Sequence, residues 1–374
     1  MLKLHVNKSI NHVLKVALFS TSIALLSGCN TSSSSSVTTK TTELDLAVID
    51  TLDNLVIPAA SNFQQQTSAL HNSANNFCTN ISEGNLDTLQ QQWKETSVAW
   101  YQLLPFQFGP MINSVALPTY SFIDYYRLAH TDSLQTVRSF IDTTLAASSN
   151  LNDLFFQIQS ARNTGLLALE ITIFETADSE SSDKADIILE FTNNSRKCEL
   201  LKGYAKELDR RAQTIHSGWT TDYADSGISY RDLLINNRLE ELDDPNEDGQ
   251  PAISKLTVAV QNYYDYLANR NVTTDIAQLA GNVWQGLEAS INSTEQMLMG
   301  STGSKVNVFA LLDNGGHEQD VANIKANLQT IQQTISDKNT VDFKAAAAVL
   351  DGNFKREIPD GLNVNLGLNF SDGD

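Results

Sequence analysis

The sequence predicts an all-α protein, and two observations carry that prediction. The seven prolines leave the spans 119–244 and 252–358 free, so each span can hold long uninterrupted helices. Runs of Val, Ile and Thr never alternate with polar residues for long, so the pattern typical of a strand is nearly missing. The predicted helices, with boundaries good to about four residues, cover 44–76, 85–104, 120–130, 132–147, 164–176, 183–218, 229–242, 253–270, 273–297, 317–336 and 339–350.

The first 28 residues have the pattern of a bacterial lipoprotein signal peptide. Basic residues precede a mostly apolar run, Val16–Leu26, which is too short to span a bilayer as a mature helix. The run ends in Leu26-Ser27-Gly28-Cys29, where small residues ahead of a Cys resemble a lipobox. We therefore expect a signal peptide over 1–28 and a lipid on Cys29.

The segment 29–43 is predicted to be a flexible tether. From Asn30 to Thr42 it is almost entirely Ser and Thr, broken by Val37 and Lys40, and such a tract cannot bury enough apolar surface to order itself. Asn30 follows the Cys, at a position where Asp would favour retention in the inner membrane. We expect a lipid-anchored protein of the cell envelope, on the outer membrane and facing the periplasm, with the membrane contacted through the lipid anchor only.

The chain is strongly acidic. Its formal net charge is −19, and the three Lys of the signal segment are lost on processing, so the mature chain is more acidic still. Such a surface argues against binding nucleic acid or anionic lipid headgroups. It is compatible with cations or basic partners, although acidic surfaces usually serve solubility alone.

The stretch Gly165–Phe174 is predicted to be a helix buried on most of its circumference, because its apolar residues form two adjoining stripes. Glu170 falls one turn from Leu166, Ile173 and Phe174, so its carboxylate points into an apolar surround. An unpaired buried charge costs several kcal/mol. Glu170 therefore needs a cation, a hydrogen-bond donor or a proton.

The same stretch resembles the signature of the imelysin family, in particular its predicted periplasmic lipoprotein branch. That signature is Gly-x-His-x-x-Glu on a buried helix; Gly165 and Glu170 match it, and Leu167 stands at the position of the His. The resemblance covers most of residues 44–374 and implies a fold of two packed helical bundles. The family is commonly labelled a metallopeptidase family and is also linked to iron uptake.

A joint between the two bundles is expected at Ala224–Ser229, which is rich in turn residues and divides two segments of ordinary domain size. This places an N-terminal bundle at 44–224 and a C-terminal bundle with its tail at 225–374. The tail, 361–374, is predicted to be non-helical and resembles the terminal pattern of the lipoprotein branch. Its Asp372 and Asp374 could supply carboxylates to a site.

Two cysteines, Cys78 and Cys198, remain once Cys29 carries the lipid. In an oxidising compartment pairing is the default, and a zinc site would need a close His or a second Cys pair. The resemblance also implies pairing, because the surroundings of both cysteines look like paired positions of the lipoprotein branch. We therefore expect a disulfide between Cys78 and Cys198.

Glu170 has two candidate arrangements. In the first it forms an ion pair with Arg127 or Arg196. In the second it joins Asp124 or a tail carboxylate around a hard cation, which suits oxygen ligands. Asp124 and Arg127 are three residues apart on a predicted helix, close enough to pair with each other.

The sequence does not support a peptidase. Such an enzyme needs a metal, a water and a general base in one cleft, and Leu167 removes the signature His. The resemblance favours a binding component associated with metal uptake, with iron or another divalent cation as the cofactor and a periplasmic or outer-membrane iron-uptake protein as the partner. A metallopeptidase of the imelysin type and a metal-free interaction module are the alternatives.

Overall fold

The computed structural model describes residues 42–112, 117–124, 133–177, 181–242 and 250–366, and within these ranges it contains helices and no strand. None of the described helices is long and apolar enough to cross a membrane. The helices of the N-terminal half are α1 Glu43–Thr51, α2 Ile57–Thr79, α3 Glu83–Leu103, α4 Ser133–Ala146, α5 Asp153–Gln157, α6 Gly165–Phe174, α7 Lys184–Asn193, α8 Ser195–Thr220 and α9 Tyr230–Ile235. Those of the C-terminal half are α10 Ala252–Asn269, α11 Val272–Asp275, α12 Val283–Met299, α13 Val308–Asn314, α14 Glu318–Ser336, α15 Thr340–Lys355 and α16 Glu357–Leu362.

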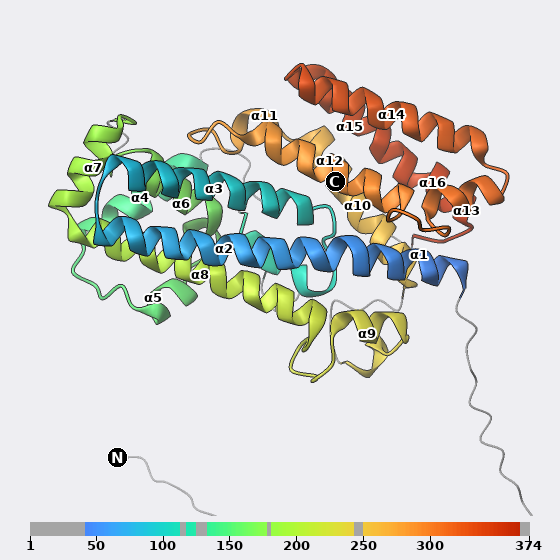
Figure 1. The fold of residues 1–374 in the computed structure, drawn as a ribbon, viewed down its shortest axis with the longest axis horizontal. Helices are drawn as coiled ribbons and strands as arrows, with labels where there is room; N and C mark the ends of the chain where they lie inside the picture. Colours follow the sequence, from blue (N-terminus) through green and yellow to red (C-terminus); the bar gives the residue numbers. More distant parts are fainter. Residues whose placement is uncertain (1–41, 113–116, 125–132, 178–180, 243–249, 367–374) are drawn as a thin grey trace, which may run out of the picture. The chain divides into compact units, whose positions relative to one another are not determined.

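The first bundle is built on three long helices, α2, α3 and α8, which lie side by side in Figure 1. The short helix α6 packs against both α3 and α8, with α4 and α7 next to it. Large aromatic side chains fill this core, among them Trp93, Trp100 and Trp219, all essentially inaccessible to solvent. The helices α3, α4, α7 and α8 therefore surround much of α6, whose residues are all buried as predicted.

The second bundle pairs α10 with α15, and α14 packs on both α15 and α12. It joins the first bundle along α12, which packs against α3. The approach is close at Gly286, where an added Cβ would lie 3.0 Å from the ring of Tyr101. The all-α fold of two packed bundles is thus confirmed, and the α3–α12 contact is where the bundles meet most extensively.

The first long helix changes its winding before Pro58, where a kink is expected. Residues Leu52–Val56 form a π-helical segment between α1 and α2, and Pro58 lies in the first turn of α2. Proline has no N–H, but in the first turn of a helix it does not remove an intrahelical hydrogen bond. Ile57, the residue before it, donates its N–H to Leu52 O, five residues earlier, and the helix continues without a break.

Other predicted helices differ from the structure in how they are divided. The predicted span 183–218 is two helices separated at Asn194, whose side chain accepts the Arg196 N–H and so caps α8. The predicted helix 273–297 is interrupted by a loop at 276–282 between α11 and α12. Of the predicted helix 120–130, the described part is a 3₁₀ turn, Thr119–Phe122, followed by non-helical residues.

Several predictions fall outside the described residues: the signal peptide 1–28, lipidated Cys29, nearly all of the tether, Arg127, and the tail carboxylates Asp372 and Asp374. Of the predicted non-helical tail, Gly361 and Leu362 belong to α16, while 363–366 are non-helical. The boundary predicted between residues 224 and 225 falls in a turn closed by a hydrogen bond from Tyr223 N to Ile228 O. That boundary stays a prediction.

Candidate functional site

Helix α6 begins at a position that only glycine can fill. Gly165 has a φ of +79°, and a Cβ there would lie 2.4 Å from Ile123 O. The next residue, Leu166, donates its N–H to that same oxygen at 2.9 Å. The glycine of the signature thus lets the chain at 122–123 press against the start of α6 and accept one of its free N–H groups.

Side chains from α3 hold both ends of α6. Trp93 donates its indole N–H to Leu166 O at 3.1 Å, and Gln90 donates its amide N–H to Ile173 O at 2.8 Å. Every residue of α6 is buried, so these main-chain groups have little access to water. Buried carbonyls need such partners, and the two bonds tie both ends of α6 to α3.

Glu170 is fully buried, and its carboxylate is held by main-chain groups of the second bundle. Its Oε1 accepts N–H bonds from Leu279 at 3.0 Å and from Ala280 at 2.9 Å. Both donors lie in the loop 276–282 that interrupts the predicted helix. These two hydrogen bonds tie α6 to the loop.

The shape of the loop 276–282 explains how it can hold a carboxylate. Ala277 and Gly281 both have positive φ, and Gly281 donates its N–H back to Ala277 O at 2.8 Å. Successive main-chain N–H groups in such a turn point to one side and form a concave anion site. Asn282 adds a second link to the first bundle by donating its amide N–H to Lys94 O at 3.3 Å.

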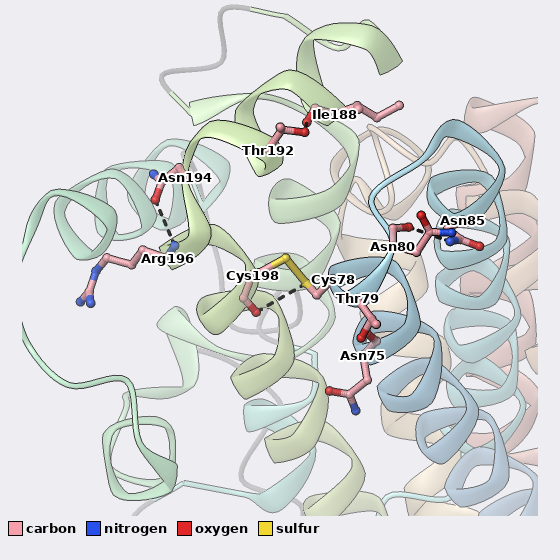
Figure 2. The surroundings of a disulfide bond; sticks show 10 residues. All are labelled: Asn75, Cys78, Thr79, Asn80, Asn85, Ile188, Thr192, Asn194, Arg196 and Cys198. Carbon is pink, nitrogen blue, oxygen red and sulfur yellow. Dashed lines mark hydrogen bonds between the residues drawn. A yellow bond between two sulfur atoms is a disulfide. The ribbon is translucent and has the colours of Figure 1, made fainter.

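Asp124 and Arg196, two of the predicted partners, make hydrogen bonds to other groups. Asp124 is buried, and its Oδ2 accepts the indole N–H of Trp100 at 3.0 Å. Arg196 directs its guanidinium to main-chain carbonyls, donating to Thr144 O at 2.9 Å and to Ser149 O at 2.7 Å. Its side chain points away from the disulfide in Figure 2. The described contacts of Glu170 include two amides of the loop, whereas Arg127 and the tail carboxylates lie outside the described residues, so the predicted ion pair and cation site stay predictions.

In the signature helix Glu170 is the one carboxylate, and no His is present. Leu167, at the position of the signature His, is fully buried and has no ligand atom. Two N–H groups point at Glu170 Oε1, and a cation beside that oxygen would face the positive ends of their dipoles. Across the part of the chain that the structure describes, no three His, Cys, Asp or Glu side chains are grouped to hold a metal.

Sequence reasoning missed a buried charge cluster at the C-terminal end of α6. Glu175 accepts two hydrogen bonds from the Arg138 guanidinium, at 2.6 and 2.7 Å, which raise the pKa of Arg138. Lys197, almost fully buried, donates to Glu175 O at 3.1 Å and pairs with Glu190. Burial lowers the pKa of Lys197, against the opposing effect of its pairing with Glu190. Four helices, α4, α6, α7 and α8, contribute to this cluster or adjoin it.

A signal for this cluster was present in the sequence. Lys197 lies at helical spacing from Leu201, Tyr204 and Leu208, which form the buried face of α8. A Lys in line with apolar residues predicts either a buried ion pair or a break in the helix. The sequence does not say which acid is the partner of Lys197. Glu190 belongs to α7, and the sequence predicts one continuous helix across the turn at Asn194 that separates α7 from α8.

The disulfide lies at the same end of the bundle. Cys78 and Cys198 are bonded, with their Cα atoms 5.6 Å apart, and the bond joins the last turn of α2 to the first turn of α8 (Figure 2). The two cysteines are separated by 120 residues in sequence. The bond therefore closes a long loop that contains α3 and the whole of α6.

The fold and the buried Gly–Glu helix define a class of two-bundle helical proteins, and comparison with known proteins names it. The imelysin family model matches residues 56–358, so the chain belongs to the imelysin family. A search of curated proteins finds no match.

Two solved structures share the fold. An imelysin-like protein from Psychrobacter arcticum has a TM-score of 0.63 at 16% identity, over 87% of this chain and 97% of that one. A putative iron-regulated protein A precursor from Parabacteroides distasonis has a TM-score of 0.60 at 12% identity, over 86% of this chain and 95% of that one.

Proposed function

We propose that this protein is a non-catalytic binding component of iron uptake, anchored by a lipid on Cys29 to the outer membrane and facing the periplasm. Family membership supports the link, and so does the fold shared with a protein titled iron-regulated protein A. The signal-like segment 1–28 and the Ser/Thr tract that follows it support the anchor.

The observation that carries this proposal is the arrangement of Glu170. In a hydrolase of the imelysin type, the signature carboxylate would work beside a metal and a water. Here it accepts two main-chain N–H groups at 2.9–3.0 Å, and Leu167 replaces the signature His. The buried helix thus has a structural task, which leaves the outer surface of the bundles to bind a partner or an iron-bearing ligand.

Iron uptake by the bacterium that encodes the chain tests the proposal. A deletion strain grown under iron limitation should take up radioactive iron more slowly than its parent. Wild-type protein should restore uptake, whereas Cys29→Ala should not, because the chain would leave the membrane fraction or stay an uncleaved precursor. The variant Glu199→Gln, on the exposed face of α8, is the matched control and should restore uptake fully. Unchanged uptake in the deletion strain would contradict the proposal.

The alternative function, a metallopeptidase, is tested by a cleavage assay on the same protein. The purified lipoprotein in detergent, incubated with an unfolded protein substrate and with iron or zinc, should release no peptides. Cleavage that depends on added metal and is lost in Glu170→Gln would support the enzyme and refute the non-catalytic assignment.

A further inference from the structure

A cavity of about 220 Å³ lies on the outside of the first bundle, between α2, α5 and α8. Its walls include His71 from α2, Phe156 from α5, and Lys206, Asp209, Arg210 and Gln213 from α8. No part of the family signature lines it. A cavity of this size is below the range usual for drug-sized ligands, so it suits a small metabolite.

Asp209 gives the cavity wall a negative charge that has no cationic partner among the described residues. Its side chain is only 8% exposed and accepts hydrogen bonds from neutral groups, Thr67 Oγ1 at 3.1 Å, Ser68 Oγ at 2.8 Å and Gln213 Nε2 at 2.8 Å. Its neighbour in the wall, Glu207, is instead neutralised by Arg210 at 2.6 Å and Arg211 at 2.8 Å. A nearly buried carboxylate without a cation is costly, and an ammonium group of a ligand would compensate it.

Two basic side chains, each paired with an acid that also lines the cavity, lie at its rim. Arg210 and Lys206 have side chains that are 45% and 54% exposed, so both remain accessible although they already contact Glu207 and Asp153 respectively. Phe156 supplies an apolar wall, and its ring rests on α8 at Gly203, where an added Cβ would lie 2.0 Å from it. An acidic wall, a basic rim and an aromatic surface are thus brought together in one small cavity.

We propose that this cavity binds a small zwitterion, an α-amino acid with an apolar side chain. The ammonium group meets Asp209, the carboxylate meets Arg210 at the rim, and the apolar side chain lies against Phe156. This site is independent of Glu170 and of the proposed role in iron uptake.

Three probes separate the contributions of the two charges. L-leucine carries both groups, 4-methylpentanoate lacks the ammonium and 3-methylbutylamine lacks the carboxylate. Isothermal titration of the detergent-solubilised full-length lipoprotein should detect binding of L-leucine, and each analogue should bind at least about 10-fold more weakly, since a lost charged contact is worth more than one factor of ten. Absence of leucine binding at millimolar concentration, or equal binding of all three probes, would overturn the proposal.

Two variants test the residues. Asp209→Asn should weaken leucine binding about 10-fold or more and leave the weak binding of 4-methylpentanoate, which has no ammonium group, unchanged. Arg210→Gln should also weaken leucine binding about 10-fold or more, and it should leave the weak binding of 3-methylbutylamine, which has no carboxylate, unchanged. Glu199→Gln, on the same helix but outside the cavity, is the matched control and should bind leucine as wild type does. If Asp209→Asn fails to fold by circular dichroism, Arg210→Gln decides, because that side chain is half-exposed. Wild-type leucine affinity in a folded variant of either residue would refute the assignment.

Discussion

Two buried carboxylates, five residues apart in the chain, are held by different means. Glu170, in the middle of α6, accepts main-chain N–H groups from a loop of the second bundle. Glu175, directly after α6, accepts two hydrogen bonds from the guanidinium of Arg138, and its main-chain oxygen accepts one from Lys197, all within the first bundle. The first arrangement joins two bundles, and the second stabilises one.

This difference explains why the two carboxylates should respond differently to mutation. The donors to Glu170 are main-chain N–H groups, which a side-chain substitution does not remove. The contact can therefore be broken only by replacing Glu170 or by reshaping the loop 276–282. The Glu175 contact is a side-chain pair and can be broken from either partner. Changes at Glu170 should therefore alter the docking of the bundles, whereas changes at Glu175 should remain local to the first bundle.

The largest effect is expected from the disulfide, which closes the loop that contains both carboxylates. Replacing Cys78 and Cys198 together by Ala should lower the free energy of unfolding by about 4–5 kcal/mol, the chain-entropy value for a loop of this length. Urea denaturation with and without the substitutions measures it. If the double variant were as stable as wild type, the disulfide would not constrain the first bundle.

The next effect concerns Glu170. Glu170→Ala leaves the N–H groups of Leu279 and Ala280 without their acceptor and opens a small cavity, so it should cost about 3 kcal/mol. Glu170→Gln keeps an acceptor oxygen and should cost less. Urea denaturation of the two variants provides the measurement, and an equal loss in both would mean that the charge, and not the acceptor geometry, holds the loop.

Arg138→Met should have a smaller effect at the Glu175 cluster. The Arg138 side chain is 22% exposed, so water can partly replace its hydrogen bonds, and we expect a loss of about 1–2 kcal/mol. The comparison predicts that the loss does not reach the second bundle. Proteolysis within 276–282 should be unchanged in this variant and faster in Glu170→Ala; faster cleavage in both would remove the distinction between the two carboxylates.

The smallest effect is a pH dependence set by Tyr204, another buried titratable group of the first bundle. Burial raises the pKa of Tyr204, and its hydroxyl has no hydrogen-bond partner among the described residues. Above pH of about 10, an unfolded tyrosine loses its proton while the folded one keeps it, so stability falls as pH rises. Tyr204→Phe should reduce that slope by up to about 1.4 kcal/mol per pH unit. An unchanged slope between pH 10 and 11 would show that Tyr204 ionises in the folded protein.

The sequence predicts the fold well because the fold depends on local patterns, which can be recognised without knowledge of tertiary contacts. Proline-free amphipathic spans predict the long helices α3, α10 and α14 to within a few residues. The burial of Glu170 also follows from its apolar neighbours on α6. Its partners do not, because Leu279 and Ala280 contribute main-chain amides, which every residue except proline carries.

The interruption at 276–282 was missed for a related reason. Gly281 and Asn282 are ordinary helix-stop residues, but they lie within a long stretch with helical periodicity, so the prediction continued through them. The turn is stabilised by the carboxylate of Glu170, which comes from a helix more than one hundred residues earlier. The residues around 276–282 therefore contain no information on that contact.

Hydrogen exchange at the amides of Leu279 and Ala280 tests most directly the claim that Glu170 holds the two bundles together. In the wild-type protein these two amides should exchange slowly, at rates comparable with buried helical amides, because each donates to a buried carboxylate. In Glu170→Ala both should exchange at least about 100-fold faster, the factor for roughly 3 kcal/mol of lost protection, while amides of α2 and α8 remain protected. Unchanged slow exchange at Leu279 and Ala280 in that variant would contradict the account.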